Sequence, residues 1–268
     1  MKIIRINATW CSGCLISKGI WKEIEKEFPN NEYIDYDYDL DEEEIEKYVE
    51  PFGGAAWVLF GKTPHSKEVY NDINGELVNL FRMVKYHPEA LQTELSFMLN
   101  SREEFFRQRG MQPETMTELQ RAARMFYLIK ASYGSKVSTF GVGFKDVSAI
   151  KNLQAVHERL SKVLIENKSF DEILQIHDSE RTLFFIDPPY HGTEKFYQMK
   201  DDFGETEHRK LAEMLYNLKG KWILTYNDDA FVRNLYEGFH IEEVERVNNL
   251  GVAIGGEKVF KELIIRNY

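Results

Sequence analysis

The stretch TLFFIDPPYHG, residues 182–192, decides how this chain is interpreted. Its apolar run from Leu183 to Ile186 predicts a buried strand that leads straight into the carboxylate of Asp187. Two prolines follow, which fix the backbone and donate no hydrogen bond, and Tyr190 adds a flat ring. Because ligands bind beyond the carboxyl ends of strands in open α/β sheets, the stretch predicts a slot for a planar group with an exocyclic amine, such as a nucleobase. The alternative is a rigid Asp-Pro-Pro turn with a surface tyrosine.

Strand patterns alternate with helix patterns outward from this stretch. Strands are expected at KIIRINAT, EYIDYDYDLD, KEVYNDIN, VLIEN and WILTYND, and at a closing pair, FHIEEVERV and KELIIRN. A helix is expected to begin within DEEEIEKY, residues 41–48. The alternation predicts a mostly parallel α/β sheet covered on both faces. Residues 86–145 have a helical pattern that interrupts it, which indicates an inserted subdomain.

The composition indicates a globular chain with its own core. With 268 residues, of which 43% are hydrophobic, it can form one large domain or two small ones. No apolar run is long enough to span a membrane, and the N-terminus lacks the apolar centre of a signal peptide. We therefore expect a cytoplasmic monomer without a membrane partner.

The charge is unevenly distributed. The net charge of −10 argues against a nucleic-acid partner, but residues 1–50 hold 6 Lys and Arg against 13 Asp and Glu. Residues 102–136 hold seven Lys and Arg against four Glu. Arg121 and Arg124 lie three apart on one expected helix and can share a face. With Lys130 and Lys136 they are candidates for contacts with DNA phosphates, the alternative being an ordinary solvated surface.

DPPY at 187–190, with EPFGG at 50–54 upstream, resembles the Dam-type DNA adenine-N6 methyltransferases. The stretches VYNDING, TFGVGF and KELIIRN are similar to other parts of that family, and they occur in the family's order. The resemblance covers residues 49–268. It implies a Rossmann-like methyltransferase sheet, with the helical insertion at about 86–145 recognising the DNA target.

The resemblance also implies a site for S-adenosylmethionine. The cofactor would lie over the turn formed by Glu50, Pro51, Phe52, Gly53 and Gly54, where glycines permit close approach of the backbone. Asp72 would hold the ribose hydroxyls, although it can also be a simple turn residue at the end of a strand. Phe170 would border the cofactor's adenine. Ser169 stands where the family often has Asp, which implies a weaker contact there.

By the same resemblance, the reaction is site-specific methylation of an adenine flipped out of double-stranded DNA. The catalytic residues would be Asp187, Pro188, Pro189 and Tyr190. Asp187 and the carbonyl of Pro188 would each accept one hydrogen of the adenine amine, and Tyr190 would stack on the base. These acceptors stabilise the positive charge that develops on the nitrogen during transfer.

Residues 1–48 resemble instead the first half of a thioredoxin, with WCSGC at an expected helix N-terminus. Cys11 and Cys14 are a working redox pair, a structural relic of a fusion, or half of a zinc site; we expect no metal. The family's usual Lys- and Gly-containing opening is absent, so we expect weak binding of S-adenosylmethionine. Two alternative functions follow, a thiol–disulfide oxidoreductase and a DNA-binding relative with weakened catalysis.

Overall fold

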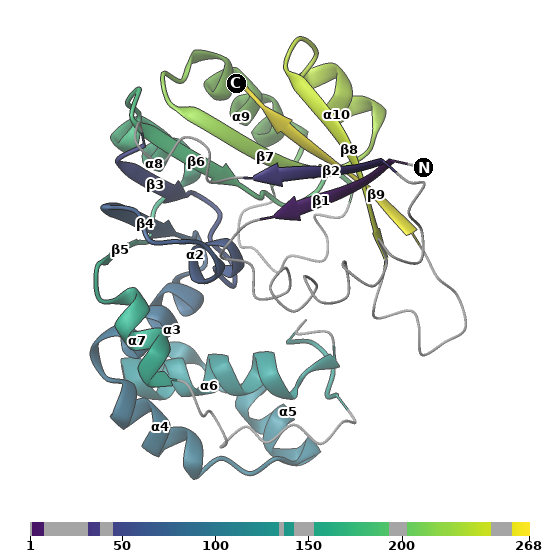
Figure 1. Ribbon diagram of the computed structural model, residues 1–268. Coiled ribbons are helices and arrows are strands. Elements are labelled where there is room, and N and C mark those ends of the chain that lie inside the picture. Colours follow the sequence, from purple (N-terminus) through teal and green to yellow (C-terminus); the bar gives the residue numbers. More distant parts are fainter. Residues whose placement is uncertain are drawn as a thin grey trace.

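The computed structural model describes residues 2–7, 32–37, 45–133, 137–141, 153–192, 203–247 and 259–268. A seven-stranded sheet runs through its centre in the order β5-β4-β3-β6-β7-β9-β8 (Figure 1). Its strands are β3 (Lys47–Glu50), β4 (Lys67–Asn71), β5 (Val163–Glu166), β6 (Thr182–Ile186), β7 (Lys221–Asn227), β8 (His240–Val247) and β9 (Val259–Arg266). Strands β3 to β7 pair in parallel, whereas β9 pairs antiparallel with both β7 and β8. This arrangement confirms the Rossmann-like fold expected from the sequence.

Strand β3 corrects one prediction from the sequence. It occupies residues 47–50, where a helix beginning within residues 41–48 was expected. Tyr48 and Val49 are both buried and pack into the clusters on opposite faces of the sheet, which a strand permits and a helix turn does not. Strand β3 also crosses the expected boundary between residues 48 and 49. The seven-stranded sheet therefore includes Lys47 and Tyr48, while the division into two parts stays a prediction.

Helices cover both faces of the sheet, as the sequence predicted. Buried residues of α2 (Trp57–Gly61), α3 (Gly75–Tyr86) and α7 (Leu153–Leu160) belong to one hydrophobic cluster with Tyr48 and Tyr70. Those of α8 (Phe170–His177), α9 (Glu205–Asn217) and α10 (Ala230–Leu235) belong to the other, with Val49 and Phe184. Both clusters bury large aliphatic and aromatic side chains, and this burial stabilises the layered arrangement.

The expected helical insertion lies between β4 and β5. It contains α4 (Pro88–Ser96), α5 (Arg102–Gly110), a short 3-10 turn (Pro113–Thr115) and α6 (Glu118–Ala131). Ser101 caps the start of α5, and Thr117 forms a capping box with Gln120 at the start of α6. Leu91, Leu95, Phe105 and Tyr127 are fully buried in the same cluster that covers the sheet. The insertion thus packs against α3 and α7 and shares the core that these helices form over the sheet, rather than having a separate core.

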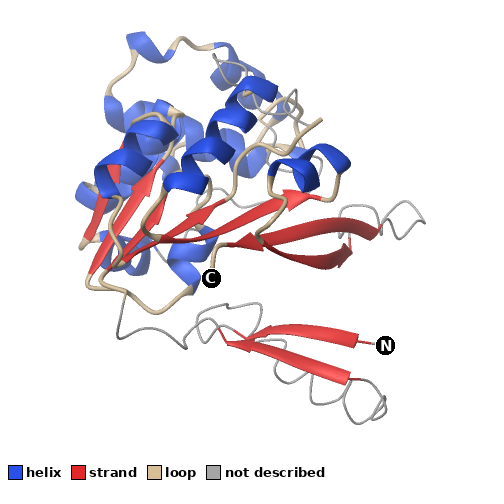
Figure 2. Cartoon of the chain, turned by 90° about the horizontal axis from the view of Figure 1, so that it is seen from above, coloured by secondary structure: helices blue, strands red, loops and turns tan. Residues whose placement is uncertain are grey.

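Two further strands lie near the N-terminus. β1 (Lys2–Asn7) and β2 (Glu32–Asp37) pair in parallel as a separate two-stranded sheet (Figure 2). Both strands were predicted from the sequence. The helix expected between them lies outside the described residues, so the likeness of residues 1–48 to thioredoxin stays a prediction.

Candidate active site

The residues singled out in the sequence meet at one edge of the sheet. Strands β3, β4, β5 and β6 are parallel, so their carboxyl ends open onto the same edge. The EPFGG turn follows β3, Asp72 follows β4, Ser169 and Phe170 follow β5, and Asp187 follows β6. The chain leaves β3 toward β4 on one side, and β6 lies on the other side. This is the switch point at which open α/β sheets bind ligands.

The EPFGG turn is closed by backbone contacts with β4. The amide of Gly53 donates to the carbonyl of Asn71 at 2.7 Å, and Tyr70 donates its hydroxyl to the carbonyl of Gly54 at 2.9 Å. Gly54 has a φ of +49°, a left-handed conformation that favours glycine. A Cβ on Gly54 would meet nothing within 4 Å. The turn therefore presents bare backbone at the edge of the sheet.

Asp72 is held by two backbone groups. Its Oδ2 accepts from the amide of Gly54 and its Oδ1 from the amide of Asn74, both at 2.8 Å. Burial raises the pKa of the Asp72 carboxyl, and these two amides oppose the rise. Each carboxylate oxygen has more than one lone pair, so it can accept a further hydrogen bond. Asp72 thus does serve as a turn residue, in a position that also suits the predicted contact with ribose.

Asn71, which the sequence analysis did not select, joins two of the strand exits. Its side-chain amide donates to the carbonyls of Pro51 at 2.8 Å and Lys168 at 3.0 Å. Its Oδ1 accepts from the amide of Lys168 at 2.9 Å. Asn71 is fully buried, so these bonds replace those that water would make. Its signal in the sequence is its place at the end of an expected strand, next to Asp72.

Phe170 and Ser169 have different surroundings. The ring of Phe170 stacks on Phe52 with centroids 5.4 Å apart, and Phe203 packs edge-on against both rings. Ser169 precedes α8 and donates its hydroxyl to Glu172 at 3.1 Å. Two of the predicted cofactor residues, Phe52 and Phe170, therefore form one apolar surface. Ser169 is engaged in capping a helix.

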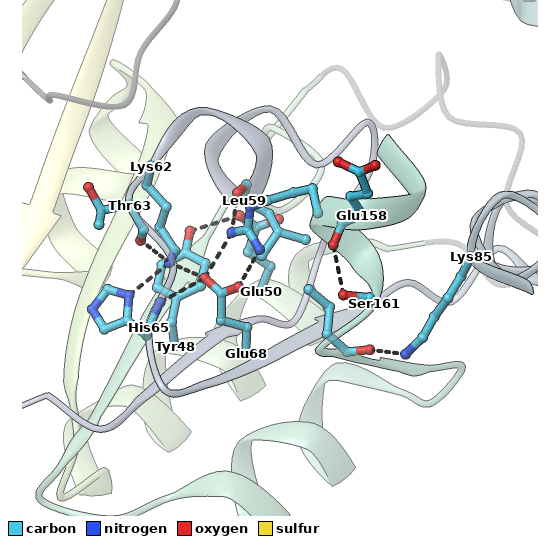
Figure 3. A network of polar contacts seen from close by, with 12 residues as sticks. Tyr48, Glu50, Leu59, Lys62, Thr63, His65, Glu68, Lys85, Glu158 and Ser161 are labelled. Atoms are coloured by element: carbon cyan, nitrogen blue, oxygen red, sulfur yellow. Dashed lines mark hydrogen bonds and ion pairs between the residues drawn. The ribbon is translucent and has the colours of Figure 1, made fainter. Parts of the chain in front are cut away.

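Glu50 points inward, away from the position that its predicted role requires. Its side chain is 2% exposed, and its Oε1 accepts from the hydroxyl of Tyr48 at 2.7 Å. Lys62 and Glu68 form a buried ion pair beside Tyr48 and Glu50 (Figure 3), and the partly buried Arg159 also pairs with Glu68. Burial raises the pKa of Glu50 to about 7. Glu50 is thus placed beneath the rest of the EPFGG turn as part of its support.

The DPPY segment begins where β6 ends. Asp187 is exposed, and its Oδ1 accepts from the hydroxyl of Thr225 on β7 at 2.7 Å. Pro188 and Pro189 are buried behind it. Tyr190 is half-buried, and its ring lies 5.9 Å from that of Tyr226. The segment therefore holds a carboxylate at the surface on a rigid, well-packed base.

The predicted DNA-contacting residues have mostly structural contacts. Arg124 is buried and donates from Nε to the carbonyl of Gln108 at 2.7 Å, at the end of α5. It is therefore not on the surface face that its spacing from Arg121 suggested. Arg121 forms an ion pair with Glu76. Lys130 is exposed and lies over the ring of Phe126.

Three predicted positions lie outside the described residues, namely Cys11, Cys14 and Lys136. Within the part of the chain that the structure describes, no group of three His, Cys, Asp or Glu residues is placed to hold a metal ion. No helix in that same part is both long and apolar enough to cross a membrane.

The chain matches the family described as D12 class N6 adenine-specific DNA methyltransferase over residues 18–250. It is 26% identical over 235 residues to the type II methyltransferase M.CviBI of Paramecium bursaria Chlorella virus NC1A, covering 82% of this chain and 89% of that protein. It is 29% identical over 266 residues to the type II methyltransferase M.MjaIII of Methanocaldococcus jannaschii, covering 86% and 91% respectively.

Among solved structures, the chain is similar to a SAM dependent methyltransferase from Agrobacterium tumefaciens. The two are 10% identical with a TM-score of 0.35, over 93% of this chain and 61% of that one, a likeness too weak to decide the fold. The family match begins at residue 18. It therefore includes part of the segment 1–48 that resembles thioredoxin.

Proposed function

Because this chain belongs to the D12 class of N6 adenine-specific DNA methyltransferases, we propose that Asp187, Pro188, Pro189 and Tyr190 form its catalytic site. The chain is a site-specific enzyme that methylates adenine in DNA with S-adenosylmethionine as the methyl donor. The observation that carries the assignment is the exposed carboxylate of Asp187 at the switch point of the sheet, directly before two buried prolines.

The residues beside Asp187 fit the cofactor. The turn at Gly53 and Gly54 offers bare backbone, and Asp72 offers a carboxylate that suits two ribose hydroxyls. The stacked rings of Phe52 and Phe170 offer an apolar surface that suits an adenine. We assign these five residues to cofactor binding, with Glu50, Pro51 and Ser169 supporting them. When bound, S-adenosylmethionine supplies a methyl group activated by a positively charged sulfur.

The chemistry of the transfer needs acceptors for the adenine amine. The lone pair of that nitrogen is delocalised into the ring, which makes it a poor nucleophile. Asp187 and the carbonyl of Pro188 accept its two hydrogens, which draws electron density onto the nitrogen and stabilises the charge that develops there. Tyr190 stacks on the base once it has left the helix. Because Pro188 and Pro189 are buried, these groups are held in position before the substrate arrives.

The DNA substrate is proposed to be double-stranded, with the insertion at residues 86–145 reading the target sequence. Among the described members of the predicted basic set, the exposed Lys130 supports a phosphate contact, whereas Arg124 is buried against the end of α5 and is withdrawn from the set. We further propose that the enzyme acts as a monomer in the cytoplasm, where DNA is accessible to it.

The test is methyl transfer from tritium-labelled S-adenosylmethionine to mixed-sequence duplex DNA that lacks N6-methyladenine. Asp187→Ala is expected to lower transfer by at least a hundredfold, while calorimetric binding of the cofactor changes less than threefold. Glu213→Ala, an exposed acidic position on α9, is the matched control and should retain full activity. Transfer by Asp187→Ala within tenfold of the parent would overturn the assignment. An insulin-reduction assay of the parent tests the oxidoreductase alternative.

A further inference from the structure

Polar side chains occupy alternate positions at the end of β7 and just beyond it, namely Thr225, Asn227 and Asp229. We call these three residues the β7 row. β7 ends at Asn227, but the backbone stays extended at Asp229, with φ −143° and ψ 159°. Alternate residues of an extended chain point to the same side. β7 pairs with β6 so that Leu224 is opposite Ile186, the residue before Asp187. The β7 row thus runs beside the segment that leaves β6.

Thr225 is bonded to the carboxylate of Asp187. Its hydroxyl lies 2.7 Å from Oδ1 of Asp187 and 3.5 Å from the carbonyl of Ile186. A hydroxyl has a single hydrogen, and the shorter contact to the carboxylate is the stronger one. Thr225 itself is fixed within the sheet, since β9 pairs with it on the other side through Ile264. The orientation of the Asp187 carboxylate is therefore set by the sheet.

The other two residues of the β7 row contact the far end of the segment 187–191, which we call the catalytic segment. Asn227 donates its side-chain amide to the carbonyl of His191 at 3.1 Å. Oδ2 of Asp229 lies 2.5 Å from Nδ1 of His191, whose ring stacks on Phe231. Oδ1 of Asp229 accepts from the amide of Val232 and so caps α10. The segment 187–191 is thus tied to one strand at both ends.

We propose that the β7 row positions the catalytic segment for methyl transfer, with Thr225 orienting the carboxylate of Asp187. The inference rests on the proposed role of Asp187. A hydrogen-bond acceptor works only along its lone-pair directions, and small errors in the placement of reacting groups cost large factors in rate. Thr225 is a positioning residue, because it touches Asp187 and acts on the adenine amine only through it.

The decisive variant is Thr225→Val, which keeps the shape and the strand preference of threonine but loses the hydroxyl. We expect kcat for transfer to duplex DNA to fall ten- to hundredfold, while KM for DNA and the Kd of the cofactor change less than threefold. Thr225→Ser restores the hydroxyl and should recover kcat to within threefold of the parent. A kcat for Thr225→Val within threefold of the parent would overturn the proposal. Equal losses in Thr225→Val and Thr225→Ser would also overturn it, because the hydroxyl that serine keeps would then have recovered no activity.

Two further variants separate the possible failures. Asp229→Asn keeps an oxygen that can cap α10, but it puts an amide nitrogen in place of the carboxylate oxygen beside Nδ1 of His191. That amide nitrogen donates instead of accepting, so the His191 ring must change its tautomer or its hydrogen-bond partner. This variant should have a lower kcat and almost the same melting temperature as the parent. An unchanged kcat would show that Asp229 does not help to position the segment 187–191. Asp187→Ala is measured in the same assay. If it remains active, the proposed function fails; if it is inactive while Thr225→Val is fully active, only this inference fails.

Discussion

The ring of Tyr70 fills the space that a side chain on Gly53 would need. A Cβ built on Gly53 would clash with Cε2 of Tyr70 and would lie 2.8 Å from the carbonyl oxygen of Asn71. Tyr70 cannot easily retreat, because it is fully buried and its hydroxyl is bonded to the carbonyl of Gly54. The glycine at position 53 is therefore required by packing against β4, in addition to any approach of a ligand.

We expect Gly53→Ala to distort the EPFGG turn, which we propose to bind the cofactor. Forcing a methyl group into a filled space costs about 1–3 kcal/mol of stability, and the turn is the part that can shift. Calorimetric titration should show cofactor affinity reduced by roughly tenfold or more. Gly110→Ala is the matched control, since its Cβ would meet nothing within 4 Å, and it should bind as the parent does. Parental affinity in Gly53→Ala would show that the turn does not hold the cofactor.

Glu50 should make stability depend on pH in neutral solution. Its folded-state pKa is about 7, above the ordinary 4.5, because burial disfavours the carboxylate. The stabilising contribution of the protonated form is full below about pH 4.5 and is lost as pH rises through 7. The full shift corresponds to roughly 3 kcal/mol.

Glu50→Gln cannot ionise, so urea denaturation from pH 5 to pH 8 should show a weaker fall in the free energy of unfolding. Tyr48→Phe removes the hydrogen bond that lowers the pKa of Glu50. In this variant the fall in the free energy of unfolding should therefore occur at higher pH than in the parent. The same pH dependence in Glu50→Gln as in the parent would contradict the prediction.

Alanine variants of Arg124 and Lys130 should have different effects, the first on stability and the second on DNA binding. Arg124→Ala removes a buried guanidinium that bonds the end of α5, so we expect a loss of about 2–3 kcal/mol in stability. Lys130→Ala should leave stability almost unchanged but reduce the salt dependence of DNA binding by about one counterion. Filter binding at several salt concentrations and thermal unfolding check both. A flattened salt dependence in correctly folded Arg124→Ala would restore Arg124 as a phosphate contact.

The N-terminal segment should limit cofactor affinity. Residues 1–50 are strongly acidic, and the resemblance predicts that they lack the lysine of the usual family opening. Losing one charge-assisted contact costs about 1.5–3 kcal/mol, or roughly one to two decades in affinity. Because β3 begins at Lys47 and Ile45 is buried, a graft of the family's Lys/Gly opening should replace residues 1–44 only. Calorimetry should show tighter cofactor binding by the graft, and equal affinities would contradict the prediction.

The sequence predicted the strands of the large sheet other than β3, because apolar runs end there in polar residues. Asp187 was found for this reason, since the contrast between TLFFI and DPPY is sharp. The helix expected within residues 41–48 was wrong for Lys47 and Tyr48. Local acidic residues favour a helix there, but pairing with β4 and β6 overrides that preference.

The contacts of individual side chains were harder to predict. Arg121 and Arg124 have suitable spacing for one face, yet nothing in the spacing shows that α5 ends against Arg124. Asn71 and Thr225 were missed because an uncharged polar residue near a strand end is common, and its partner lies far away in the sequence. Asn71 bonds to Lys168, and Thr225 bonds to Asp187. Such pairs become visible only once the order of the strands is known.

The position of β6 beside β3 has a consequence for synthesis of the chain on the ribosome. β3 is the first strand of the large sheet, but its neighbour on one side, residues 182–186, is made only after the whole helical insertion. The side chain of Asn71 likewise lacks its hydrogen-bond partners at residue 168 until the backbone of Lys168 has been made. β3 therefore emerges long before β6, with one backbone edge unpaired and its apolar side chains uncovered in the meantime. A nascent chain halted before residue 168 would have its insertion helices and the partners that close the EPFGG turn, but neither β6 nor the backbone of Lys168 that Asn71 bonds, and would need protection from aggregation.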